Sequence, residues 1–274
     1  MKTRKDIACF IITVIVLSGV VDCLIAKGVS NYLYVLLMWI PAIAAVIASL
    51  VTLKDNGEKI TLRQINSLCG IRKCKWRYVF IGMFIPMIYL TVPYAIYWIA
   101  NPGSLHTNAT SVGGALIGVL LAIVLGNIGS MITALGEEIG WRGFWVPRME
   151  ETFGVNKALA ITSIIWCLWH FPLIIFDDYM AGTPLWYNLL FFTLCIFPVG
   201  VIAGILALKS ESVWPSAMLH AAHNNYDQSI LGPRTIGENK MYFVSETGVL
   251  TVVCAWIIAI LMYISFKKSL AKKA

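Results

Sequence analysis

Three separated groups of polar side chains lie in stretches of the sequence that are otherwise strongly apolar. An ionisable or amide side chain at membrane depth is costly and is a functional candidate by default. The groups are Glu137, Glu138 and Arg142; His170; and His220 with Asn224. Their residue types are those that hydrolytic enzymes use to activate water and to bind a developing negative charge.

The first group contains two glutamates that point in different directions on a helix. Glu138 and Arg142 are four residues apart and share a face, so their spacing predicts an ion pair. Glu137 points about 100° away and lacks that partner. A carboxylate in apolar surroundings without a counter-charge becomes a proton acceptor near neutral pH. The alternative is that the whole cluster only anchors one end of a helix at the membrane surface.

The other two groups are built around histidines. His170 follows Trp169 and precedes Phe171, and desolvation by such neighbours favours the neutral imidazole. His220 and Asn224 are four residues apart and point to the same place. Alternatively, His170 is a core histidine bonded to a backbone carbonyl, and the third group holds helices together through hydrogen bonds.

Taken together, the three groups favour hydrolysis of an amide by activated water. The free glutamate can take a proton from water, a neutral histidine can hold it, and a second histidine with an asparagine amide can bind the oxyanion. A side-chain nucleophile is a weaker alternative. Ser163 lacks the Gly-x-Ser-x-Gly context, and Cys167 is a thiol in an apolar helix that stays protonated.

The elements that position these groups are membrane helices. Hydrophobic residues make up 59% of the 274 residues and charged residues only 13%. Continuous apolar runs without period-two alternation indicate helices rather than a barrel. The sequence thus predicts an all-α polytopic bundle of about eight transmembrane helices. The runs are 7–26, 31–53, 78–99, 113–136, 158–176, 186–208, 213–226 and 247–266, of which the seventh is short and interrupted by polar residues.

The basic residues predict the topology. With the N-terminus inside and alternating sides, 18 of the 21 Lys and Arg residues fall on the cytoplasmic side. An odd number of spans would place the C-terminal lysines outside. We therefore expect a multi-pass protein of the cell membrane with both termini in the cytoplasm. The basic excess indicates contact with anionic lipid of the bilayer rather than nucleic acid.

The chain is predicted to form one membrane-embedded domain over residues 1–274. A short interfacial helix is expected from Leu62 to Leu68 in the longest cytoplasmic loop. The polar groups lie in the fourth, fifth and seventh runs, so they must converge on a polar cavity within the bundle. We place Glu137 at the cytoplasmic end of its run, and we expect the cavity to open to the cytoplasm.

The same residues carry a family resemblance. The pattern Glu137-Glu138-x-x-x-Arg142, Trp166-x-x-x-His170 and His220-x-x-x-Asn224 resembles the three-motif signature of the CPBP (Abi) family, the CAAX-prenyl and bacteriocin-processing intramembrane proteases. The motif core spans 137–224. Trp166 stands where the family usually has phenylalanine; both are bulky aromatic residues, so we expect little effect.

The resemblance implies roles for the motif residues. Glu137 with His170 would activate water, His220 and Asn224 would form the oxyanion hole, and Glu138 and Arg142 would support the site. Members are often called metalloproteases, and Glu137, His170 and His220 are suitable zinc ligands in type. No His-Glu-x-x-His is present, and a metal-bound glutamate could not also be the base. We therefore favour catalysis without a metal or other cofactor.

The expected function is an intramembrane endopeptidase that acts on a membrane-associated peptide or protein from the cytoplasmic side. Prenylated tails, leader peptides and signalling peptides all remain possible substrates. One alternative is a non-catalytic immunity or partner protein on the same scaffold. A proton-coupled transporter is less favoured, because internal repeats and paired broken helices are missing from the sequence.

Overall fold

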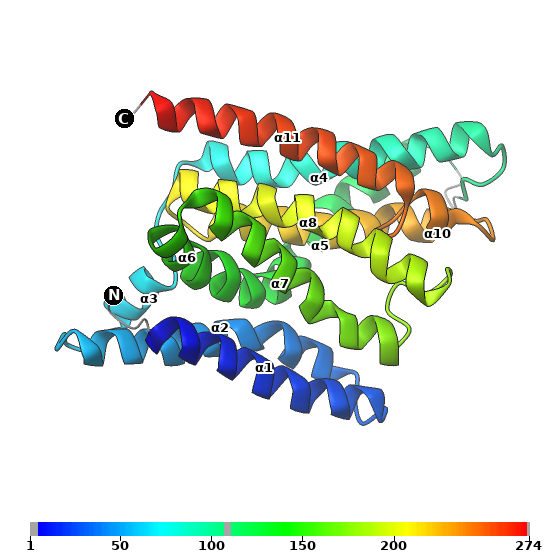
Figure 1. Cartoon of the computed structure of the whole chain (residues 1–274). Helices are drawn as coiled ribbons and strands as arrows, with labels where there is room; N and C mark the ends of the chain where they lie inside the picture. Colours follow the sequence, from blue (N-terminus) through cyan, green and yellow to red (C-terminus); the bar gives the residue numbers. More distant parts are fainter. Residues whose placement is uncertain (1–4, 107–110, 273–274) are drawn as a thin grey trace.

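Every regular element in the described residues, 5–106 and 111–272, is helical in the computed structural model (Figure 1). Within these ranges, seven helical stretches are long and apolar enough to cross a membrane. They are α1 (Lys5–Ala26), α2 (Tyr32–Asp55), α4 (Trp76–Ala100), the continuous stretch Leu116–Phe153, α7 (Val155–Phe176), α8 (Leu185–Ser210) and α11 (Val249–Ala271). The protein is therefore an all-α, multi-pass membrane bundle, as predicted.

The seventh predicted span, residues 213–226, is not one α-helix. Its segment forms α9 (Trp214–Asn224), which is too short to cross a bilayer by itself. It continues without a break into the π-helix η2 (Asn225–Leu231) and the 3₁₀ turn η3 (Gly232–Arg234). Despite its length, α9 lies at the centre of the bundle, packed against α4, α5 and α8.

The helix that carries the two glutamates does not end where the sequence predicted. α5 (Val112–Glu138) continues through the π-helix η1 (Ile139–Trp145) into α6 (Val146–Phe153). Glu137 therefore lies within a continuous helical stretch, whereas the sequence placed it at the end of its run. Glycines allow close packing against this continuation. A Cβ atom at Gly140 would lie 2.4 Å from the Pro41 side chain, and one at Gly143 would lie 2.0 Å from the Cys69 carbonyl oxygen.

Both ends of the described chain lie at the same end of the bundle (Figure 1). α1 begins there and α11 ends there, in agreement with an even number of passages. The short helix α3 (Leu62–Leu68) lies at this end too, at the residues that the sequence predicted. Its first turn is capped by the Thr61 hydroxyl, which accepts a hydrogen bond from the Gln64 N–H at 3.3 Å.

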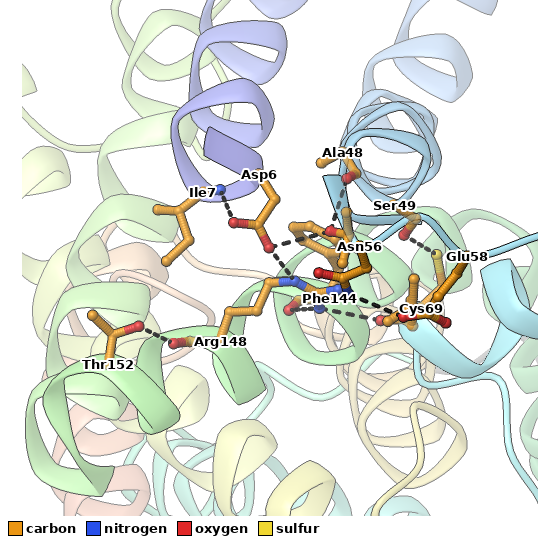
Figure 2. A network of polar contacts seen from close by, with 12 residues as sticks. Asp6, Ile7, Ala48, Ser49, Asn56, Glu58, Cys69, Phe144, Arg148 and Thr152 are labelled. Carbon is orange, nitrogen blue, oxygen red and sulfur yellow. Dashed lines mark hydrogen bonds and ion pairs between the residues drawn. The ribbon is translucent and has the colours of Figure 1, made fainter. Parts of the chain in front are cut away.

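A partly buried ion pair fixes the beginning of α1 to α6 (Figure 2). Arg148 Nε lies 3.0 Å from Asp6 Oδ2, and the two side chains are only 8% and 15% exposed. The same guanidinium donates to the Phe144 carbonyl at 2.9 Å, and Thr52 of α2 donates to Asp6 at 3.3 Å. Three helices therefore depend on one charge pair.

We expect Arg148→Met to destabilise the protein, because it leaves the Asp6 carboxylate without its cation in a largely dry site. Loss of one member of a buried pair costs on the order of 3 kcal/mol, or roughly 6–12 °C in melting temperature. Thermal unfolding in detergent measures the change. Lys5→Gln is the control, since the Lys5–Asp55 pair is 3.8 Å apart and its side chains are 68% and 48% exposed. Equal melting temperatures for the two variants would contradict the prediction.

Candidate active site

Glu137 is held toward α7 by a hydrogen bond from an aromatic side chain. Its side chain is buried, and Trp166 Nε1 donates to Glu137 Oε2 at 2.8 Å. Because an indole nitrogen only donates, the carboxylate oxygen is the acceptor. The free glutamate of the first motif is thus bonded to the first residue of the second motif.

Glu138 joins the first motif to the third. Its Oε1 accepts from Arg142 Nη1 at 2.8 Å and from His220 Nδ1 at 3.0 Å, and both members of the Glu138–Arg142 pair are 0% exposed. This confirms the predicted ion pair. The Arg142 guanidinium also lies over the Trp166 ring, with 4.0 Å between its Cζ and the ring centroid. Glu138 and Arg142 therefore form a layer behind Glu137 that links α5, η1, α7 and α9.

His170 is oriented by its own helix. Its Nδ1 lies 2.8 Å from the Trp166 carbonyl oxygen, four residues earlier. A carbonyl can only accept, so Nδ1 carries the hydrogen and Nε2 of the neutral ring keeps a lone pair. This is the backbone bond that a purely structural core histidine also makes. What distinguishes His170 is that its ring lines a cavity.

That cavity brings the predicted residues together. It has a volume of about 260 Å³. Glu137, His170, His220 and Asn224 all line it, and they come from α5, α7 and α9. Ser163 and Cys167 are not among its lining residues; Ser163 instead donates to the Leu159 carbonyl at 2.8 Å. The convergence that the sequence required is therefore found, and neither side-chain nucleophile shares it.

The cavity extends toward the end of the bundle opposite the chain ends. Its walls include Tyr34 near the beginning of α2, Leu173 near the end of α7, and Tyr179 and Glu246 in the loops that follow α7 and precede α11. A separate cavity at the other end is lined in part by Arg142 and Gly143. The cavity that holds the motif residues thus extends toward one end of the molecule, and the described chain ends lie at the other.

Sequence reasoning missed a second polar wall of this cavity. His223 Nε2 lies 3.0 Å from Glu246 Oε1, and the Tyr179 hydroxyl donates to Glu246 Oε2 at 3.1 Å. Burial raises the pKa of Glu246, but the hydrogen bond and charge of His223 outweigh it and hold the pKa below its ordinary value. Glu246 and Tyr179 lie in loops and belong to no motif, so the sequence does not predict their place in this wall. The one available signal was that His223 lies within the third motif, between His220 and Asn224.

Glu137, His170 and His220, the three residues suitable in type as zinc ligands, all line the cavity. Among the described residues, no group of three His, Cys, Asp or Glu side chains is arranged to hold a metal ion. Glu137 Oε2 is bonded to Trp166, and His220 Nδ1 is bonded to Glu138. Each bond occupies one atom of its side chain, and among the hydrogen bonds of the described residues Glu137 Oε1 and His220 Nε2 have no partner.

Comparisons with known proteins agree with the three motifs. Residues 118–226 match the family model described as Rce1-like, type II CAAX prenyl endopeptidase. The chain aligns over 237 residues with CAAX prenyl protease 2 of Methanococcus maripaludis and is 28% identical to it. The aligned region covers 82% of each protein. The matched segment contains every motif residue. These findings confirm the resemblance to the CPBP family, and they support a CAAX-type intramembrane protease.

Proposed function

Because the chain carries the Rce1-like segment in a multi-pass helix bundle, we propose that it is an intramembrane endopeptidase that uses water activated by Glu137 and His170. The observation that carries this proposal is the convergence of Glu137, His170, His220 and Asn224 on one cavity. The substrate would be a membrane-associated peptide or protein. A prenylated C-terminal tail is the first substrate to test, since the relative is named for such tails.

The proposed reaction needs one water molecule and one proton acceptor. The water oxygen attacks the peptide carbonyl carbon while Glu137 takes a proton from the water and His170 Nε2 orients it. The carbonyl oxygen becomes an oxyanion that His220 and Asn224 bind. The C–N bond then breaks as the leaving nitrogen takes the proton from Glu137. Every atom of the water ends in the two products, and the enzyme returns to its starting state.

The partners of the two histidines support different roles for them. His170 donates to a neutral carbonyl, which gives no charge to stabilise an imidazolium. His220 donates to the Glu138 carboxylate, which favours the protonated ring. A protonated His220 can offer its Nε2–H to an oxyanion while a neutral His170 accepts from water. The Asn224 amide would supply the second donor.

We further propose that the end of the bundle where α1 begins and α11 ends lies in the cytoplasm. This orientation follows from the positive-inside rule, because the sequence assigns 18 of the 21 Lys and Arg residues to the cytoplasmic segments. With this orientation, the cavity extends toward the opposite membrane surface. The cytoplasmic opening expected from the sequence therefore does not fit the cavity walls formed by Tyr34, Tyr179 and Glu246.

The function can be tested in cells that make either the wild-type protein or Glu137→Gln at equal levels. Proteomics of membrane peptides should find substrates that are cut in the first cells and intact in the second. The membrane side of the cut bonds also tests the proposed orientation. If both cells contain the same peptides, the protein is a non-catalytic partner on this scaffold.

We expect proteolysis to be insensitive to chelators. The probe is an internally quenched peptide with a farnesylated cysteine followed by three residues, cleaved by purified protein in detergent micelles. Dialysis against EDTA or 1,10-phenanthroline should leave kcat unchanged, because the proton chemistry needs only Glu137 and His170. Loss of activity that added Zn²⁺ restores would contradict catalysis without a metal.

A further inference from the structure

Trp166 lies at the centre of the site, where its side chain contacts Glu137, Arg142, His170 and His220. Its side chain is 3% exposed. The ring centroids of His170 and His220 lie 5.6 and 5.3 Å from it, both edge-on, and the Arg142 guanidinium covers its face. A side chain packed on these sides has little rotational freedom, so its N–H is a fixed donor.

Trp166 therefore holds both Glu137 and His170, the two residues proposed to activate water. The indole N–H of Trp166 bonds Glu137 Oε2 at 2.8 Å, and its backbone carbonyl bonds His170 Nδ1 at 2.8 Å. Glu137 comes from α5 and reaches the cavity through three rotatable side-chain bonds. The hydrogen bond from α7 fixes it relative to His170, which is on the same helix as Trp166.

The hydrogen bond from Trp166 also gives the two oxygens of the Glu137 carboxylate different roles. Oε2 is occupied by the indole, which leaves Oε1 to face the cavity and accept the proton from water. Catalysis of this kind depends strongly on the position of the base, and a misplacement of about 1 Å can cost on the order of 100-fold in rate. Phenylalanine has a similar ring but no N–H, and so it could pack here without holding Glu137.

We propose that Trp166 is a positioning residue that sets the Glu137 carboxylate relative to His170 through its indole N–H. This inference rests on the proposed peptidase function. It differs from our expectation that tryptophan in place of phenylalanine has little effect in this chain.

The test compares two replacements of Trp166 in the purified protein with the farnesylated quenched peptide. Trp166→Phe removes the donor and part of the ring, whereas 3-benzothienylalanine at position 166 keeps the shape and removes only the N–H. We expect both to lower kcat by roughly 10- to 100-fold, with KM unchanged, since a hydrogen bond to a charged group is lost. Trp256→Phe is the control, because Trp256 donates to the Leu194 carbonyl at 2.8 Å, away from the cavity.

The outcomes separate this inference from the proposed function. Wild-type kcat in the benzothienylalanine protein, or a change in KM alone, would overturn the positioning role while Glu137→Gln remains inactive. Equal losses in Trp166→Phe and Trp256→Phe would also overturn it, since they would show a general structural effect. Cleavage that survives Glu137→Gln would instead refute the peptidase mechanism itself.

Discussion

Glu137→Gln should abolish cleavage of the farnesylated peptide, with a loss of at least about 10³-fold in kcat. The variant keeps the size of the side chain, and its amide oxygen can still accept the Trp166 hydrogen bond, so the fold should be retained. What is lost is the group that takes the proton from water. Single-turnover cleavage by the purified protein, alongside its melting temperature, measures both properties.

The control for this variant is Glu58→Gln. Glu58 is exposed, and its carboxylate accepts hydrogen bonds from the neighbouring Asn56 and Gln64 side chains. The Glu58→Gln variant should cleave the peptide at the wild-type rate. Substantial cleavage by Glu137→Gln would leave Glu137 as a structural residue, which is the interfacial-anchor alternative that the sequence also allowed.

Arg142→Met should produce the largest loss of stability. The change leaves Glu138 in a site with 0% exposure and with only His220 to balance its charge. Removal of one partner from a buried pair costs roughly 3–5 kcal/mol. The expected result is a large fall in melting temperature together with loss of activity, because the Glu138 carboxylate that orients His220 loses its other partner.

The double variant Glu138→Leu/Arg142→Met separates charge from packing. It removes both charges, so it should be more stable than Arg142→Met alone, although still inactive. Within the described residues, Glu138 Oε2 and Arg142 Nε and Nη2 make no hydrogen bond, which shows that the pair is not an optimal stabilising network. A double variant that melts no higher than the single one would contradict this account.

Local spacing and composition were sufficient to predict most elements. The apolar runs agree with the long helices to within a few residues, and α3 begins and ends at the predicted residues. The four-residue spacing of Glu138 and Arg142 predicts their ion pair. The same spacing of His220 and Asn224 predicts that they share a helix face. Each of these features depends on neighbours within one helical turn.

The features that the sequence did not predict depend on distant contacts. The close packing of η1 depends on Gly140 and Gly143, which let Pro41 and Cys69 approach it, and no local pattern indicates that approach. The bond from Trp166 to Glu137 joins α5 to α7. Glu246 reaches the cavity from the loop that precedes α11. The direction of the cavity likewise depends on which loops cover it, and this is a property of the assembled bundle.

The most direct test of direct attack by water is cleavage of the farnesylated peptide in H₂¹⁸O with hydroxylamine present. A protein-bound acyl intermediate would be trapped as a hydroxamate, whereas direct attack places oxygen from water in the new carboxylate. We predict that mass spectrometry of a single turnover finds one ¹⁸O atom in the new carboxylate and no hydroxamate. A hydroxamate product would contradict hydrolysis by water activated at Glu137.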